Sequence, residues 1–194
     1  MTDLVIGADG KARCPWGSST DYLAYHDTEW GQPLHGDDHL YERMTLEAFQ
    51  SGLSWLTILR KRENFRAAFD HFKIKKVAAY DERDVARLMA DTGIVRNRQK
   101  VDAAIANARA ALEVDGGLSR LLWSYAPPRR PHRPRGSADV PAITPESTAL
   151  AKDLKKRGFR FVGSTICYAF MQAVGMVNDH QIDCFRYREL GGDG

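Results

Sequence analysis

Four side chains of types that commonly bind metal ions lie near the two ends of this chain. Cys14 and His26 stand near the N-terminus, and His180 and Cys184 lie within VNDHQIDCF near the C-terminus. If the second pair is helical, its spacing places both side chains on one face. Two thiolates and two imidazoles complete a tetrahedral zinc shell of the structural kind, which leaves no open position for a substrate. The pattern predicts a fold whose ends meet at zinc, and four ordinary buried residues are the alternative.

Length and composition predict one globular domain over residues 1–194. Hydrophobic residues make up 43% and charged residues 27% of the chain, as is usual for such domains. The segment MTDLVIGADGK includes no apolar signal region, and no apolar run is long enough to span a membrane. Three cysteines cannot all pair with one another, which favours a reducing compartment, and Cys167 is expected in the core. We expect a soluble, unexported protein with flexible ends over about residues 1–12 and 188–194.

The spacing of apolar residues predicts an all-α fold. In residues 81–93, Val85 and Leu88 lie at a helical interval, and Gly93 is a stop signal. Alternation with a period of two residues is almost absent, so no sheet is expected. A stretch rich in proline and arginine predicts a long basic loop over 126–145. The predicted helices span residues 38–50, 54–69, 81–93, 97–112, 148–158 and 163–175.

Basic residues gather in short clusters, although the net charge is only +3. One interpretation is a surface that faces nucleic-acid phosphates. The alternative is a set of solvated helix faces and one basic loop, and the charge pattern alone does not decide between them. The clusters are RKRENFR at 60–66, KIKK at 73–76, RNRQK at 96–100, RRPHRPR at 129–135 and KKRGFR at 155–160.

The two predicted helices on either side of GIVRNR (93–98) form a candidate helix-hairpin-helix motif. A tight turn at Gly93 would expose backbone N–H groups beside a helix N-terminus, where a phosphate is favoured. Arg96, Arg98 and Lys100 would add positive charge at the same place. Because the turn has a single glycine, a simple corner between two helices is at least as good an interpretation.

Aromatic residues crowd the chain around His26, and an acidic residue and a further tryptophan follow them. The aromatic residues around His26 are Trp16, Tyr22, Tyr25 and Trp30. Glu47 follows them, eight residues before Trp55. Such a group suits an electron-poor nucleobase, since the rings stack on the base and the carboxylate accepts hydrogen bonds from its N–H groups. The alternative is a set of core aromatics beside a surface carboxylate.

Four longer segments, together with the Cys/His set, carry a family likeness. The segments are YHDTEWG (25–31), LEAFQSGLSWLTILRKRENFRAAF (46–69), TGIVRNRQKVDAAIANARA (92–110) and LKKRGFRFVGSTICYAFMQAVGMVNDH (154–180). In order and spacing they resemble the 3-methyladenine DNA glycosylase I family, bacterial enzymes of constitutive alkylation repair. The resemblance covers about residues 12–185. It implies a helix-hairpin-helix DNA glycosylase fold with a structural zinc site that joins the N- and C-terminal segments.

The resemblance also implies roles for single residues. The implied zinc ligands are Cys14, His26, His180 and Cys184. Glu47 would accept a hydrogen bond from the extruded methylated base, which Tyr25 and Trp55 would also contact. Further aromatic wall would come from Trp16, Tyr22 and Trp30. Gly52 and Leu53 would plug the gap that the extruded base leaves in the duplex.

Two features depart from the family pattern. The spacing from Cys14 to His26 is one residue shorter, and Pro15 follows the cysteine. This difference could shift the aromatic residues that follow. The loop 126–140 is unusually rich in arginine, which could change the affinity for DNA.

The implied reaction is hydrolysis of the N-glycosidic bond of 3-methyladenine in double-stranded alkylated DNA, which releases the free base and leaves an abasic site. Methylation at ring nitrogen 3 makes the base cationic, so it departs without protonation by an acid. Extrusion costs a few kcal/mol, least for a damaged pair. No lysine is placed as an evident Schiff-base nucleophile, which implies a monofunctional enzyme. We expect a monomer in the bacterial cytoplasm, without a membrane partner.

Two other functions remain open from the sequence. A zinc-stabilised DNA-binding module without catalysis would keep the hairpin, the basic residues and the metal site. It would not need Glu47 and its aromatic neighbours, because binding a DNA backbone requires no such pocket. A zinc hydrolase would use three protein ligands and an open position, whereas four candidate ligands are present.

Overall fold

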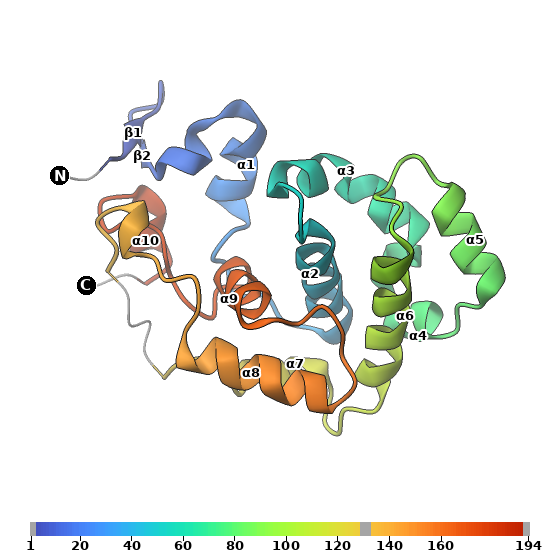
Figure 1. The fold of residues 1–194 in the computed structure, drawn as a ribbon. Helices are drawn as coiled ribbons and strands as arrows, with labels where there is room; N and C mark the ends of the chain where they lie inside the picture. Colours follow the sequence, from blue (N-terminus) through green and yellow to red (C-terminus); the bar gives the residue numbers. More distant parts are fainter. Residues whose placement is uncertain (1–2, 129–132, 192–194) are drawn as a thin grey trace.

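The computed structural model describes residues 3–128 and 133–191 and has a mainly helical architecture (Figure 1). Its α-helices are α1 Thr20–Thr28, α2 Asp37–Gln50, α3 Trp55–Ala68, α4 Ile74–Ala78, α5 Glu82–Ala90, α6 Arg98–Leu112, α7 Leu118–Trp123, α8 Pro145–Lys156, α9 Ser164–Ala173 and α10 Phe185–Glu189. Short 3-10 helices span Pro15–Ser18, Asp70–Phe72 and Ser137–Asp139, and the strands are β1 Val5–Ile6 and β2 Ala12–Arg13. The predicted predominance of helix is confirmed.

Helix α2 lies at the centre of the molecule, in contact with α3, α6, α7 and α9 (Figure 1). Most of its residues between Leu40 and Phe49 are buried. A helix that is enclosed on nearly all sides belongs in the interior of a domain. Glu47 therefore enters the interior because the packing of α2 carries it there.

Side-chain caps explain where several helices begin. Ser54 accepts a hydrogen bond from the backbone N–H of Thr57 at the start of α3. Asp81 forms a capping box at the start of α5. The predicted start of the helix at 148 is wrong by three residues, since Thr144 caps α8 and Pro145 occupies its first turn. Proline is favoured there because the first N–H groups of a helix have no partner within it.

The structure contradicts the expected absence of sheet, and the His180–Cys184 step, considered above as a possible helix, is not helical. Strands β1 and β2 form an antiparallel hairpin in which Val5 lies opposite Arg13. The segment from His180 to Cys184 consists of bends and turns, and Cys184 is the N-cap residue of α10. Strands of two residues are too short for an alternating pattern to indicate them.

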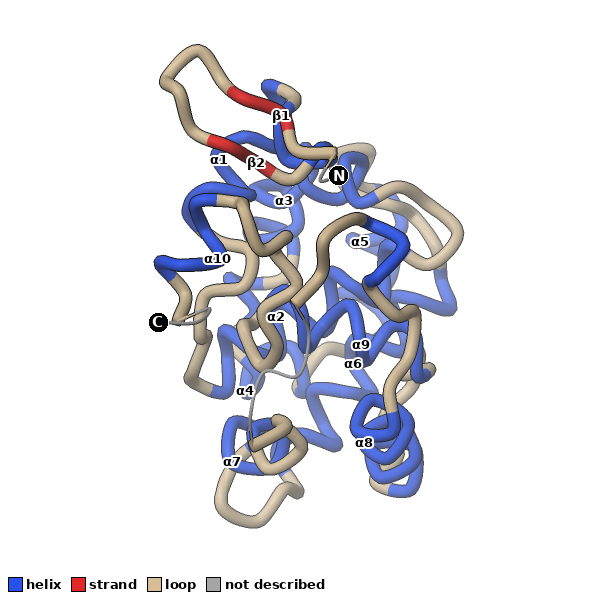
Figure 2. Tube along the Cα trace, turned by 90° about the vertical axis from the view of Figure 1, so that its left-hand side faces the viewer, coloured by secondary structure: helices blue, strands red, loops and turns tan. Residues whose placement is uncertain are grey.

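The N- and C-terminal segments lie on the same side of the molecule (Figures 1 and 2). The side-chain amide of Gln181 donates to the carboxylate of Asp3 over 2.7 Å, and α10 packs against β2. The segments that were expected to be flexible thus include the β1–β2 hairpin and the last residues of α10. Residues 1–2 and 192–194 of these segments lie outside the described part.

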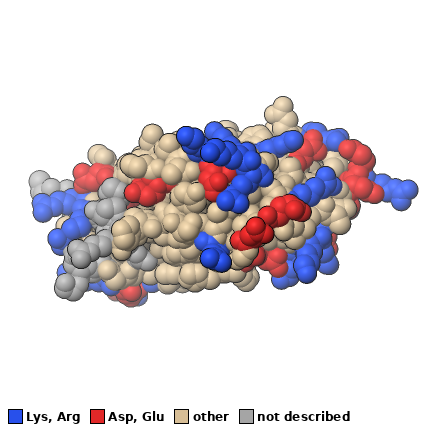
Figure 3. Space-filling view, turned by 90° about the horizontal axis from the view of Figure 1, so that it is seen from below, with Lys and Arg blue, Asp and Glu red and all other residues tan. Residues whose placement is uncertain are grey.

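Basic and acidic side chains are interspersed on the face drawn in Figure 3. Several members of the predicted basic clusters have acidic partners: Arg60 pairs with Asp21, and Arg66 pairs with Glu42. Part of the arginine-rich cluster, residues 129–132, falls outside the described ranges. Within those ranges, no helix is both long and apolar enough to cross a membrane.

Candidate functional site

The four predicted metal ligands come together in one buried cluster. The ligand atoms of Cys14, His26, His180 and Cys184 all lie within 4.8 Å of one another. The Sγ atom of Cys184 is 3.7 Å from His180 Nδ1 and 3.6 Å from His26 Nε2, and Cys14 Sγ is 3.8 Å from His180 Nδ1. Tetrahedral zinc with usual bond lengths separates sulfur and nitrogen ligands by about 3.6 Å. The spacing and the donor atoms fit such an ion.

Outer contacts orient both imidazoles toward the cluster. His26 Nδ1 lies 2.8 Å from a carboxylate oxygen of Asp27, which Arg13 also binds, so its Nε2 faces the cluster. His180 Nε2 lies 3.1 Å from the carbonyl oxygen of Trp30, so its Nδ1 faces the cluster. Such second contacts fix the tautomer of a ligand histidine. Burial also lowers the pKa of His180, which favours the neutral form that binds metal.

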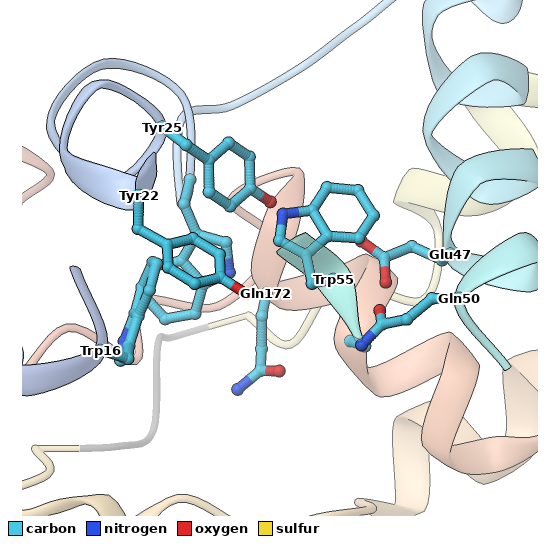
Figure 4. Close-up of a pocket in the computed structure, with 9 residues that line it drawn as sticks. Trp16, Tyr22, Tyr25, Glu47, Gln50, Trp55 and Gln172 are labelled. Carbon is cyan, nitrogen blue, oxygen red and sulfur yellow. The ribbon is translucent and has the colours of Figure 1, made fainter. Parts of the chain in front are cut away.

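An aromatic cavity of about 290 Å³ lies next to this cluster, since Trp16 and Trp30 of its lining pack against His26 and His180. Figure 4 shows residues that line the cavity. Its lining residues are Trp16, Tyr22, Tyr25, Trp30, Glu47, Gln50, Trp55, Ala169 and Gln172. The structure thus brings all of the predicted aromatic residues together with the predicted carboxylate. The predicted alternative of a surface carboxylate is wrong, because Glu47 is only 5% exposed.

The carboxylate of Glu47 is the charged acceptor of the cavity. No described residue donates a hydrogen bond to it, and it lines the cavity near Trp55 and Gln50 (Figure 4). Burial raises the pKa of Glu47 to about 7, and the positive charge of Arg43 opposes that rise. A ligand that brings N–H groups or positive charge would relieve this cost of burial.

The aromatic rings form two walls. The rings of Tyr25 and Trp55 lie at a tilt of 42° with their centroids 5.5 Å apart. Trp16 and Trp30 pack edge to face at 4.9 Å. The second pair also rests on the metal cluster, since Trp16 lies 5.1 Å from the ring of His26 and Trp30 lies 4.7 Å from the ring of His180. The metal cluster and one wall of the cavity are therefore built together.

Sequence reasoning missed Arg43, Gln50 and Gln172. Arg43 is buried and donates a hydrogen bond to the hydroxyl oxygen of Tyr25 over 2.9 Å. The sequence held a signal for Arg43, because a residue four positions before Glu47 on the same helix lies on the same helix face as Glu47. Gln50 follows on the same helix, and Gln172 reaches the cavity from α9.

The predicted plug residues line a second hollow beside the aromatic cavity. Leu53 is 42% exposed, and Gly52 has a φ of 76°, which favours glycine in this turn. A second hollow extends from Glu47 and Gln50 past Leu53 to Ile166. An exposed apolar side chain thus lies in a hollow that adjoins the aromatic cavity.

The candidate hairpin differs from its predicted form. Lys100 is only 7% exposed, and its ammonium group donates hydrogen bonds to the carbonyl oxygens of Phe49 and Ser51. This geometry contradicts the expected contact of Lys100 with a phosphate, because the group is already bound inside the protein. The N–H of Gly93 is likewise occupied, since it donates to the side chain of Asp91 over 2.7 Å.

The two hairpin arginines are exposed but differ in their partners. Arg98 pairs with Glu82 and Asp102. Arg96 makes no ion pair or hydrogen bond with another residue of the described ranges. Of the three predicted basic contacts, Arg96 therefore has the charge that is most available to a ligand.

Comparisons with known proteins agree with this architecture. A family model described as methyladenine glycosylase matches residues 16–187. The DNA-3-methyladenine glycosylase 1 of Escherichia coli is 48% identical over 184 residues, which cover 90% of this chain and 96% of that protein. The corresponding enzyme of Haemophilus influenzae is 43% identical, with 89% and 96% covered.

Solved structures give the same result. A crystal structure of 3-methyladenine DNA glycosylase I superposes with a TM-score of 0.85 at 48% identity and covers 89% of this chain and 98% of that one. The Staphylococcus aureus enzyme, whose structure addresses recognition of 3-methyladenine, has a TM-score of 0.85 at 36% identity, with 89% and 95% covered. The chain belongs to the methyladenine glycosylase family.

Proposed function

We propose that this protein hydrolyses the N-glycosidic bond of 3-methyladenine in alkylated double-stranded DNA and releases the free base. The observation that carries this proposal is the buried carboxylate of Glu47, which lines an aromatic cavity. No described residue donates a hydrogen bond to this carboxylate. Relatives that share 43–48% of their residues with this chain are named for this reaction.

The cavity suits the chemistry of the lesion. Tyr25 and Trp55 offer ring faces for stacking, and Glu47 can accept hydrogen bonds from the exocyclic amine of the base. The methylated base is cationic while it is attached to the sugar, so it favours the ionised form of a carboxyl whose pKa is about 7. Because the base leaves as a neutral molecule, it needs no general acid.

The surroundings of the cavity support a monofunctional enzyme. Among the described residues that line it there is no lysine that could form a Schiff base with the sugar. Lys100 is held by two carbonyl groups beneath the loop that carries Leu53. Water then takes the place of the base on the sugar, so an abasic site is the second product.

We assign the contacts with the DNA duplex to exposed residues around the cavity and between α5 and α6. Leu53 would fill the gap left by the extruded base, with Gly52 allowing the turn that presents it. Residues 91–97, between α5 and α6, would act as the hairpin of a helix-hairpin-helix motif, with Arg96 near a phosphate. We expect the protein to act as a monomer in the bacterial cytoplasm.

Zinc is the metal that fits the four-residue cluster. Cys14, Cys184, His26 and His180 would hold it in a closed shell, and its contribution would be structural. It would join the two ends of the chain and support Trp16 and Trp30, which line the base cavity.

The test is release of free base from methylated duplex DNA. Wild-type protein should release 3-methyladenine, and Glu47→Gln should release it about 5- to 150-fold more slowly, since the loss of a charge-assisted hydrogen bond costs about 1–3 kcal/mol. Glu63→Gln, which changes an exposed carboxylate of α3, is the matched control. DNA binding without release would indicate a non-catalytic module, and instant loss of activity in a folded protein on chelation would indicate a zinc hydrolase.

A further inference from the structure

Arg43 stands at the junction of the three helices that carry the base cavity. It lies on α2, and its guanidinium donates to the hydroxyl oxygen of Tyr25 on α1 over 2.9 Å. The same group lies 5.3 Å from the ring centroid of Tyr25 and 5.4 Å from that of Trp55 on α3. One buried cation, 8% exposed, thus contacts both rings of the stacking wall.

A carboxylate behind the cavity balances the charge of Arg43. Glu29, at the end of α1, lies 3.6 Å from the Arg43 guanidinium and also binds Arg62 of α3. Although burial opposes it, these guanidinium groups hold the pKa of Glu29 below its ordinary value. Because Glu29 keeps Arg62 as a partner, removing Arg43 does not leave a buried carboxylate unpaired.

We infer that Arg43 is a positioning residue of the base pocket, which fixes the hydroxyl of Tyr25 so that its hydrogen points to a ring-nitrogen acceptor of the bound base. A phenolic oxygen accepts through its lone pairs and donates through a single hydrogen. The Arg43 N–H occupies an acceptor position, so the hydroxyl hydrogen is left for the ligand.

Other features of the site agree with this role. Burial raises the pKa of Tyr25, so the phenol stays protonated and can donate. Glu47 can only accept when ionised, whereas a nucleobase presents both N–H groups and acceptor nitrogens along one edge. A carboxylate and an oriented hydroxyl together match both kinds of group, and this matching distinguishes a base edge from a simple cation.

A double-mutant cycle on binding of free 3-methyladenine tests the inference, which rests on the proposed function. Arg43→Met should weaken binding about tenfold in the Tyr25 protein and less than about threefold in Tyr25→Phe. Any effect of the Arg43 charge on Glu47 occurs in both backgrounds and cancels in the comparison. Equal losses in the two backgrounds would overturn the inference.

Two further variants complete the experiment. Arg66→Met breaks another ion pair between α3 and α2, with Glu42, that lies outside the cavity, and it should leave binding unchanged. If Arg43→Met does not fold, Arg43→Lys serves in the same cycle, since it keeps the charge but lacks the planar fork that reaches two partners. Failure of wild-type protein to bind 3-methyladenine would instead contradict the proposed function.

Discussion

The Sγ atom of Cys184 lies 3.6 Å from Nε2 of His26, although 158 positions separate the two residues. The Cys/His cluster therefore closes a loop that contains most of the protein. In such a site the free energy of metal binding is also free energy of folding, because the unfolded chain has no preformed shell. Trp16 and Trp30 pack against His26 and His180, so we expect the order of the aromatic cavity to depend on the same closure.

Replacing one ligand should remove the metal and destabilise the whole fold. We expect Cys184→Ala to lose stoichiometric zinc and to lower the melting temperature by roughly 10 °C, which corresponds to about 3–4 kcal/mol for a protein of this size. Metal analysis and thermal unfolding measure both effects. Cys167→Ala, which removes a buried thiol outside the cluster, should keep its zinc. Full zinc content in Cys184→Ala would contradict the assignment.

The buried carboxyl of Glu47 should make stability depend on pH. Folding raises its pKa from 4.5 to about 7, mainly through burial. The folded state thus favours the protonated form, so the associated stability is present below about pH 4.5 and is lost as the pH rises through 7. The unfolding free energy of Glu47→Gln minus that of wild type should therefore rise by about 2–3 kcal/mol from pH 4.5 to pH 8. Urea unfolding across this range measures it, and a constant difference would show that Glu47 titrates normally.

Much of the site could be predicted because its residue types are unusual where they stand. Cysteine and histidine near both ends, and a carboxylate among aromatic residues, offered a metal shell and a base cavity as one of two interpretations each, and the family resemblance implied these roles. Lys100 could not be placed in this way. Its partners, the carbonyl groups of Phe49 and Ser51, lie about 50 residues away, and only the packing of α2 against α6 brings them together. Helix α1 was missed because it lacks an apolar stripe.

Lys100 should support the plug loop and should not anchor the DNA backbone. Its ammonium group binds carbonyl oxygens at the C-terminal end of α2, where positive charge is favourable. Lys100→Met leaves these carbonyls without their donor, so we expect a loss of about 1–3 kcal/mol in unfolding free energy. Excision from duplex should slow, while the dependence of DNA affinity on salt should stay as in wild type. A shallower salt dependence would mean that Lys100 does reach a phosphate.

Arg96 should account for the phosphate contact at the hairpin. Its side chain is exposed and has no acidic partner in the described ranges, unlike that of Arg98. A phosphate contact releases counterions, so Arg96→Ala should reduce the slope of log affinity against log salt by about 1. The loss should be equal for methylated and unmethylated duplex, since a phosphate carries no information about the base. Arg98→Ala is the comparison, and an equal change of slope in both variants would show that ion pairing does not restrain Arg98.

Leu53 should act through apolar insertion into the duplex, which differs energetically from the phosphate contact of Arg96. Its side chain is 42% exposed and lines the hollow beside the aromatic cavity, so contact with unstacked bases would bury it. Leu53→Ala should slow excision from duplex about tenfold, because removal of a contact worth about 1.4 kcal/mol has that effect on a rate. The salt dependence should hardly change, since no counterion is released. Methylated single-stranded DNA needs no plug, so its rate should fall much less.

Leu112→Ala, which truncates an exposed leucine at the end of α6, is the matched control. Wild-type excision from duplex by Leu53→Ala would show that the loop does not enter the base stack.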